Sequence, residues 1–303
     1  MGPRDSSAFS LATWTTTLSS LRQHVLGDGG VCDPNLMSCS SIPNHDGCCS
    51  PTYGIVVLAQ QWYPALGPNS SFTLHGLWPD KCNGRQGPRN GCDASRHYPN
   101  LGDIISREDA ALRKEMETYW PSYRPGDPAS FWNHEWTKHG TCVSTLHPKC
   151  SAGEGGEEEE EGHADVLEYF HTALSLRRTY DLAAALAAQG ITPGQSRYRI
   201  EDVESAIEEA YGLEVEAHCD RGRIREIWGW FRVRGRNTYV PTQPIRNGRR
   251  SCRGWVRLPD KTGALTDEES YDPFFLETDD DDNEEEEEDS DPFFLPLSLS
   301  KDA

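Results

Sequence analysis

The order of apolar and polar residues along this 303-residue chain predicts strands of two kinds. Residues 53–62 form a short continuous apolar run, which is typical of a strand buried on both faces. Residues 72–82 alternate apolar with polar positions, as a half-buried strand does, and they carry His75 near their middle. Three later segments also favour strands, namely residues 213–219, 224–233 and 255–259.

Apolar positions three and four residues apart predict helices between these strands. The predicted helices are residues 104–120, 164–188 and 201–211, together with a short helix that starts at Phe131 and stops at Gly140. Pro121 and Gly190 end the first two. Because strands and helices interleave without regular β–α–β repeats, the pattern indicates a single α+β domain.

Composition sets the limits of this domain. We expect residues 1–31 to be a poorly structured leader, in which no clear signal peptide stands out. We expect residues 263–303 to be a disordered acidic tail. The domain proper is residues 32–262, with an acidic insertion at 151–162. Nowhere does the chain hold an 18-residue apolar span, so we expect no membrane-spanning segment.

The net charge of −20 comes from two acidic clusters. Six acids lie in residues 154–161 and twelve in 277–291, so 31 of the 49 acids remain against 29 bases. The folded body is therefore nearly neutral. This balance is compatible with a nucleic-acid substrate in a local cleft, but it lacks the basic excess of a strong duplex binder.

The ten cysteines form an even set, which favours five disulfides and an oxidising compartment, either secreted or vacuolar. Zinc binding is the alternative interpretation. The chain has no paired Cys-x-x-Cys units, and the adjacent Cys48 and Cys49 are poorly spaced as ligands, so we expect no metal. Asn69 begins an N-glycosylation sequon, which matters only if the protein is exported.

The short helix after Phe131 concentrates chemically active side chains. Residues four apart are neighbours on a helix, so His134 lies over Lys138 and Glu135 over His139. Taken alone, this could be a solvated helix surface, and His75 could be a satisfied core histidine. Together they form a set suited to proton transfer around a phosphoryl group, because imidazoles exchange protons near neutral pH and an ammonium neutralises charge.

Two motifs resemble the active-site segments of the ribonuclease T2 family. They are His75-Gly-Leu-Trp78-Pro and His134-Glu135-Trp-Thr-Lys138-His139-Gly-Thr-Cys. The resemblance covers residues 32–260 and is greatest to the fungal, ten-cysteine branch. It implies a disulfide-stapled α+β domain with a central antiparallel sheet, acting as a monomer that cleaves single-stranded RNA without metal or cofactor. DNA is not cleaved, because the attacking 2′-hydroxyl belongs to RNA.

The resemblance also implies roles. His139 is the general base, His75 the general acid and His134 the phosphate-binding residue, while Lys138 and Glu135 stabilise the transition state. The products are a 2′,3′-cyclic phosphate and then a 3′-phosphate. The implied disulfides are Cys32–Cys49, Cys39–Cys82, Cys48–Cys150, Cys92–Cys142 and Cys219–Cys252.

Base recognition is where this sequence departs from the family's pattern. The implied base-binding residues are Trp78, Asp80, Gln61 and Phe131. In the family an aromatic residue follows the cysteine at position 82, but residues 83–87 contain no ring. Because stacking contributes about 1 to 3 kcal/mol per base, we expect broad base selectivity there, with Arg85 as a planar substitute.

Three other functions would also use some of these residues. A zinc protease motif needs histidines four apart, whereas His134 and His139 are five apart. A serine hydrolase has no Gly-x-Ser-x-Gly support. An inactive homologue that serves as a storage or RNA-binding protein is the alternative from another functional class, although this chain keeps all three histidines of the motifs.

Overall fold

The computed structural model describes residues 32–40, 46–122, 126, 128–150, 162–245 and 251–262. The predicted leader at 1–31 and acidic tail at 263–303 lie outside them, as does most of the acidic insertion, at 151–161.

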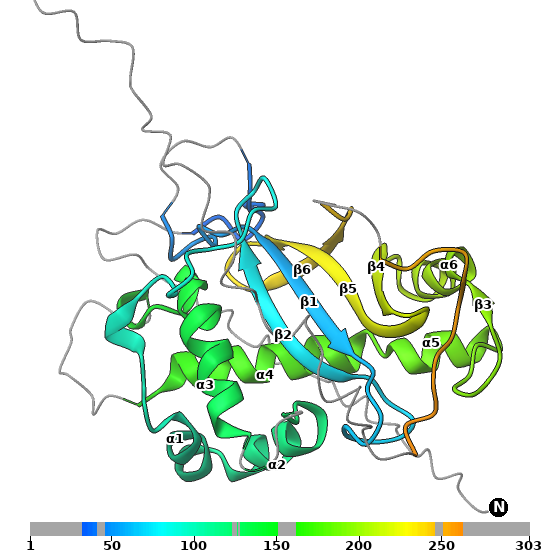
Figure 1. Cartoon of the computed structure of the whole chain (residues 1–303). Coiled ribbons are helices and arrows are strands. Elements are labelled where there is room, and N and C mark those ends of the chain that lie inside the picture. Colours follow the sequence, from blue (N-terminus) through cyan, green and yellow to red (C-terminus); the bar gives the residue numbers. More distant parts are fainter. Residues whose placement is uncertain are drawn as a thin grey trace, which may run out of the picture. The chain divides into compact units, whose positions relative to one another are not determined.

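A five-stranded antiparallel sheet forms the centre of the domain, in the order β2-β1-β5-β4 with β6 also paired to β5 (Figure 1). Its strands are β1 (Ile55–Gln61), β2 (Thr73–Asp80), β4 (Val215–Asp220), β5 (Arg223–Arg234) and β6 (Thr238–Thr242). A second, two-stranded sheet pairs β3 (Tyr198–Arg199) with β7 (Trp255–Val256). The predicted α+β class is therefore confirmed.

The helices are α1 (Leu101–Glu108), α2 (Ala110–Tyr119), α3 (Ala129–Lys138), α4 (Ala164–Thr179), α5 (Leu182–Ala188) and α6 (Ile200–Tyr211). Two predicted helices are each broken by an aspartate. Asp109 leaves the helical conformation and its side chain accepts from the Leu112 amide, so residues 104–120 form two helices. Asp181 caps α5 in the same way. None of the described helices has the length and apolar character needed to cross a bilayer.

The short active-site helix also differs from its prediction. It begins at Ala129 and ends at Lys138, and Gly140 starts a 3₁₀ turn instead of terminating an α-helix. A Cβ on Gly140 would lie 2.3 Å from the Trp136 ring. The glycine is therefore required by close packing against α3 at this point.

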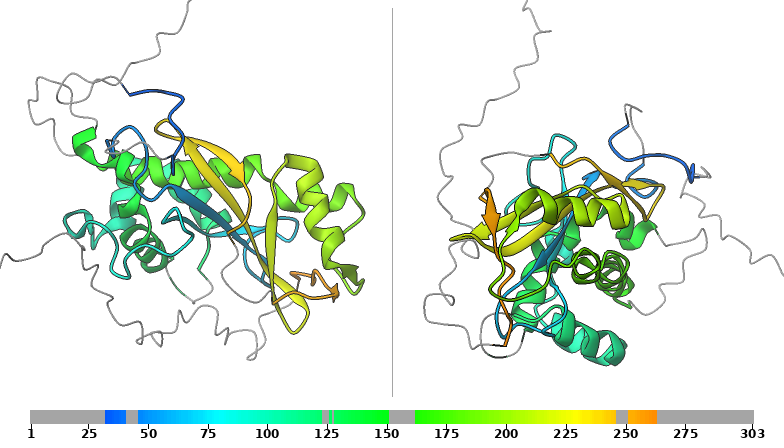
Figure 2. Two further views of the ribbon diagram at one scale, coloured as in Figure 1. Left: turned by 90° about the horizontal axis from the view of Figure 1, so that it is seen from above. Right: turned by 90° about the vertical axis from the view of Figure 1, so that its right-hand side faces the viewer.

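The main core lies between one face of the sheet and the helices. Trp62, Trp120, Trp132 and Trp136 are completely buried there, and α4 runs along the sheet (Figures 1 and 2). Among the residues that the structure describes, the opposite face carries a small cluster around Val57 and Trp230. β1 is paired on both sides and buried along its whole length, which explains the apolar run at residues 55–59.

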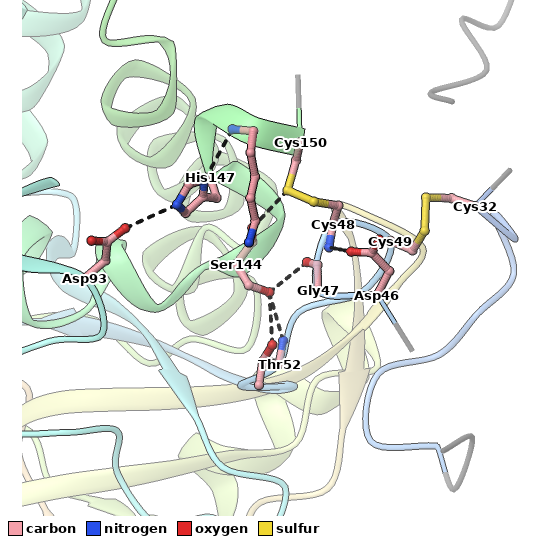
Figure 3. Close-up of a disulfide and its surroundings, with 11 residues drawn as sticks. Cys32, Asp46, Gly47, Cys48, Cys49, Thr52, Asp93, Ser144, His147 and Cys150 are labelled. Carbon is pink, nitrogen blue, oxygen red and sulfur yellow. Dashed lines mark hydrogen bonds and ion pairs between the residues drawn. A yellow bond between two sulfur atoms is a disulfide. The ribbon is translucent and has the colours of Figure 1, made fainter. Parts of the chain in front are cut away.

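The structure forms five disulfides, and their pairs are the five that the resemblance implies: Cys32–Cys49, Cys39–Cys82, Cys48–Cys150, Cys92–Cys142 and Cys219–Cys252. Beside the Cys48–Cys150 bridge, the Ser144 hydroxyl donates to the Gly47 carbonyl and accepts from the Thr52 amide (Figure 3). These contacts fasten the irregular N-terminal region to the segment that follows α3.

Candidate active site

A β-bulge in β2 presents His75. The register between β1 and β2 shifts at Ala59 and Gln60, which pair with Gly76 and Leu74, so His75 is the extra residue. Bulges re-aim side chains. Gly76 has no side chain, and a Cβ there would lie 2.1 Å from Glu135 Oε2. The missing side chain therefore lets α3 approach the strand closely.

Trp78 lies next to both of the histidines that the resemblance assigns to acid–base catalysis. Its ring is 4.9 Å from the His75 ring and 5.5 Å from the His139 ring, measured between centroids. Its indole N–H donates to Glu135 Oε2 at 3.0 Å. His134 is exposed at the outer side, with its ring 6.4 Å from that of His139. Residues from β2 and α3, distant in sequence, thus meet in one site.

A chain of indole hydrogen bonds fixes the two segments relative to each other. Trp132 on α3 donates to the carbonyl of Trp120, and Trp120 donates to the carbonyl of His75, each at 2.7 Å. Both indoles are completely buried. The backbone of His75 is therefore tied through α2 to α3, as a preorganised site requires.

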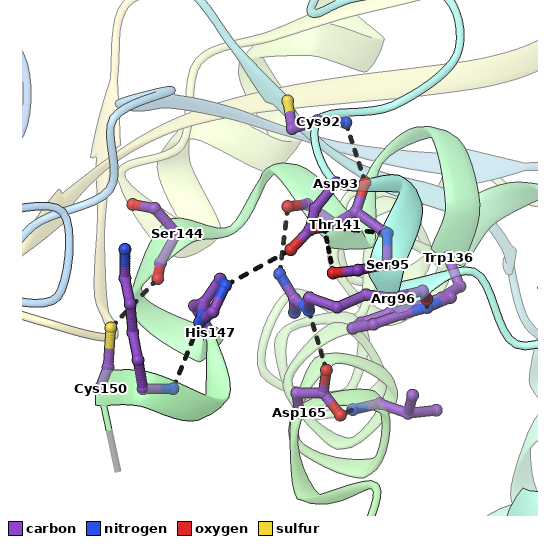
Figure 4. A network of polar contacts seen from close by, with 12 residues as sticks. Cys92, Asp93, Ser95, Arg96, Trp136, Thr141, Ser144, His147, Cys150 and Asp165 are labelled. Atoms are coloured by element: carbon purple, nitrogen blue, oxygen red, sulfur yellow. Dashed lines mark hydrogen bonds and ion pairs between the residues drawn. The ribbon is translucent and has the colours of Figure 1, made fainter. Parts of the chain in front are cut away.

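The segment after His139 is held by a buried polar network (Figure 4). Arg96 donates to the carbonyl of Thr141 and to Asp165 on α4, at 3.2 and 2.9 Å. The Thr141 hydroxyl accepts from the Cys92 amide, and Cys92 is bonded to Cys142. The residues that directly follow His139 are therefore held in place by α4 and by the loop that carries Cys92.

Glu226 on β5 is a site residue that the sequence analysis did not identify. His75 Nδ1 donates to Glu226 Oε1 at 2.7 Å, and Glu226 Oε2 accepts from Trp228 Nε1 at 2.7 Å. Glu226 is almost fully buried. A lone glutamate inside an apolar strand run gives no local signal, and its partner lies 151 residues away along the chain.

The two imidazoles are tuned in opposite directions. Burial alone would lower the pKa of His75, but the charge and hydrogen bond of Glu226 outweigh burial, so this pKa is raised. For His139, burial and then the positive charge of Lys138 and the charges of His134 and His75 hold the pKa well below its usual value. His75 therefore favours the protonated form and His139 the neutral form.

Burial raises the pKa of two carboxyl groups to about 7, those of Glu135 and Asp80, although the nearby Lys138 ammonium opposes the rise in both. Burial also lowers the pKa of Lys138. Near neutral pH a large share of each carboxyl is protonated, and a protonated carboxyl can donate a hydrogen bond.

Potential metal donors gather in one place in the described part of the chain. Ligand atoms of His134, Glu135 and His139 lie within 4.8 Å of one another. The set fits a metal poorly, because Glu135 Oε2 already accepts from Trp78 and the charge of Lys138 acts on both Glu135 and His139. A cation there would be repelled by this ammonium.

The residues that the resemblance assigns to base binding lie in different environments. Trp78 is half-buried and Asp80 is buried at the end of β2. The Phe131 ring lies 5.9 Å from that of His75. Gln61 is completely buried and its amide donates to the carbonyl of Leu74, so it presents no surface to a base in this conformation. Asn69 is exposed in the β1–β2 connection.

Comparison with known proteins identifies the family. A family model described as the ribonuclease T2 family matches residues 48–240. Ribonuclease Rh of Rhizopus niveus is 44% identical over 230 residues, which cover 76% of this chain and 92% of that protein. Ribonuclease T2 of Aspergillus oryzae is 34% identical over 226 residues, covering 72% and 79%. The crystal structure of Actibind, a T2 ribonuclease, superimposes with a TM-score of 0.67 at 32% identity, covering 77% and 98%.

The matched region includes both histidine motifs and four of the five strands of the main sheet in full, and the start of the fifth. The curated relatives span most of the domain at identities above 30%, and the solved T2 ribonuclease has the same fold. The chain therefore belongs to the ribonuclease T2 family and is a ribonuclease.

Proposed function

We propose that this ribonuclease cleaves single-stranded RNA by metal-independent transesterification. The observation that carries the proposal is the pair of imidazoles that both lie next to Trp78, with their pKa values shifted in opposite directions. A reaction that removes one proton and delivers another needs a neutral base and a protonated acid together.

In the first step, His139 takes the proton of a ribose 2′-hydroxyl, and the 2′-oxygen attacks the adjacent phosphorus. The 5′-oxygen of the next nucleotide departs with the proton of His75, which leaves a 2′,3′-cyclic phosphate. Glu226 holds His75, the general acid, through Nδ1 of the imidazole. Nε2 of the same ring is then the nitrogen that faces the leaving group. In the second step the roles reverse, and water opens the ring to a 3′-phosphate.

Three further side chains stabilise the charge that develops on the phosphoryl oxygens. His134 holds the phosphate from the exposed side, and the Lys138 ammonium neutralises its charge. Glu135, protonated in part because its pKa is about 7, donates a hydrogen bond to a phosphoryl oxygen. Trp78 and Asp80 bind the base on the 5′ side of the cleaved bond, and Phe131 contacts the base on the 3′ side.

We also propose that the protein works as a monomer in an oxidising compartment, with a glycan at Asn69. Five disulfides and an exposed sequon support export. Small-angle scattering tests the monomeric state, and mass determination before and after deglycosylation tests the glycan.

The decisive experiment is incubation of purified protein with RNA and with DNA of the same sequence in excess EDTA. We expect RNA fragments that end first in 2′,3′-cyclic phosphate and later in 3′-phosphate, and intact DNA. Loss of RNA cleavage in EDTA would contradict the metal-independent mechanism. Binding of RNA without cleavage would favour the inactive-homologue alternative.

A further inference from the structure

An open groove of about 490 Å³ lies beside the active site. One wall is a polar stripe on α3, formed by Ser130, Asn133, His134, Thr137 and Lys138. These positions are three and four residues apart and therefore share one face of the helix. The opposite wall comes from the loop and short turn between β2 and α1, with Arg89, Asn90 and His97.

The groove is positively charged. Its described lining residues include the cations Arg89 and Lys138 and the imidazoles His97 and His134, and they include no carboxylate. Arg89 lies close enough to Lys138 to act on it: burial is the main reason that the pKa of Lys138 is lowered, and the charge of Arg89 adds to that effect. Asp80 and Glu135 act on the same ammonium, but neither lines the groove.

The loop that carries Arg89 is fixed against α3. Gly91 has a φ of +77°, and a Cβ there would lie 2.0 Å from the carbonyl oxygen of Thr137. The next residue, Cys92, is bonded to Cys142 behind the helix end. The loop is therefore anchored on α3 within two residues of Arg89, and the guanidinium lies at the edge of the groove. Because the loop is already ordered, binding of a ligand costs little further conformational entropy.

We propose that this groove binds a second phosphate of the RNA chain, one that flanks the scissile phosphate, with Arg89 as its principal cation. The inference rests on the proposed function, because it takes RNA as the substrate. From Ser130 to Lys138 the helix rises about 12 Å, eight steps of 1.5 Å, which is longer than a single phosphate requires.

Two polar atoms on the groove residues support a ligand. His97 Nε2 and Asn133 Oδ1 are buried and have no hydrogen-bond partner among the described residues. Buried polar atoms are nearly always paired. When either side chain turns its atom toward the groove, a ribose hydroxyl can donate to Asn133 Oδ1, and a phosphate oxygen can accept from His97 Nε2 where that nitrogen carries a proton.

A kinetic comparison tests the assignment. Substrates are a dinucleoside monophosphate and the same molecule carrying one more phosphate, at its 5′ or its 3′ end. For Arg89→Ala, we expect the loss in kcat/KM on one extended substrate to exceed the loss on the dinucleotide by about tenfold, the size of one charge-assisted contact. Arg107→Ala, which removes an exposed guanidinium on α1, is the matched control and should show no such difference. Equal losses on all substrates would overturn the inference.

A binding measurement separates this inference from the catalytic proposal. The probe is a trinucleotide with a 2′-deoxyribose at the cleaved position, which cannot react. The slope of log K against log salt should be shallower by about 0.7 for Arg89→Ala than for the wild type, because one phosphate contact is lost. An unchanged slope would overturn the phosphate site. Wild-type protein that shows this slope yet never cleaves RNA would refute the proposed function and leave the site standing.

Discussion

At the scale of single residues, the two histidines of the site differ in their nearest charges. His75 is paired with the carboxylate of Glu226, whereas His139 is surrounded by Lys138, His134 and His75. Both rings contact the indole of Trp78, so the two imidazoles lie close together and yet have pKa values shifted in opposite directions. The assignment of acid and base therefore follows from the neighbours of each ring.

The first prediction concerns Glu226→Gln, which keeps the shape of the side chain and removes its charge. The pKa of His75 should then fall, because the main influence that raises it is lost. Activity requires protonated His75, so the alkaline limb of the kcat/KM profile should move to lower pH by about one unit. The acid limb, set by His139, should stay. Glu216→Gln on the neighbouring strand β4 is the control, and an unmoved alkaline limb in Glu226→Gln would contradict the pairing.

The second prediction concerns the histidines themselves. His75→Ala and His139→Ala should each reduce kcat by roughly 10²- to 10⁴-fold, since each removes one proton transfer. His171→Ala should leave kcat at the wild-type value, because that ring is exposed on α4 and its hydrogen-bond partner among the described residues is Asp109, outside the active site. Circular dichroism should show all three variants folded. Near-normal turnover by either site variant would remove its role.

At the scale of helices and strands, the sequence predicts the elements that have a clear local pattern of apolar residues. Continuous or alternating apolar runs mark β1, β2, β4 and β5. β6 was not predicted, because residues 238–242 are partly exposed and contain Pro241. The breaks at Asp109 and Asp181 were missed because an aspartate inside a helical pattern acts as a cap only when the chain turns there.

The residues of the active site also divide into those with a local sequence signal and those without one. The motif residues of β2 and α3 could be predicted, since they are contiguous in sequence. Glu226 and Arg89 could not, because each joins the site only through tertiary contact: one by pairing β5 with β1 beside β2, the other by packing a loop on α3. The burial of Gln61 likewise depends on both of its neighbouring strands.

The third prediction tests how the Arg89 loop is seated. Gly91→Ala and Gly190→Ala both place a side chain at positive φ, at a cost of about 1 to 2 kcal/mol. Only Gly91 faces a close backbone atom, whereas nothing lies within 4 Å of a Cβ at Gly190. Gly91→Ala should therefore lower the free energy of unfolding by about 1 to 3 kcal/mol more than Gly190→Ala, measured by urea denaturation. Equal losses would show that the loop is loosely seated.

At the scale of the whole molecule, the disulfides divide into two groups. Four of them join cysteines that lie outside β1 and β2, in the segments before β1 and after β2, to one another or to the turns that follow α3. Cys219–Cys252 lies apart and joins β4 to the chain before β7. The crosslinks thus concentrate where regular structure is sparse and where the active site is assembled.

The fourth prediction compares one bridge from each group. Cys92–Cys142 and Cys219–Cys252 close loops of 50 and 33 residues, so replacing either pair with serines should cost about 4 kcal/mol in the chain-entropy model. Stability losses should be alike. Activity, measured well below each melting temperature, should fall clearly only without Cys92–Cys142, which tethers both His139 and the Arg89 loop. Equal activity losses would mean that the bridge does not position the site.

The contact of Trp78 with both imidazoles gives the enzyme a built-in optical reporter. A protonated imidazole quenches indole emission more strongly than a neutral one, and this indole lies beside both rings. The difference in fluorescence between wild type and Trp78→Phe, followed across pH, should therefore contain one transition for each ring, besides one near pH 7 from Glu135, which accepts from the indole N–H. The protonation state of the resting enzyme could then be observed directly, with no substrate present.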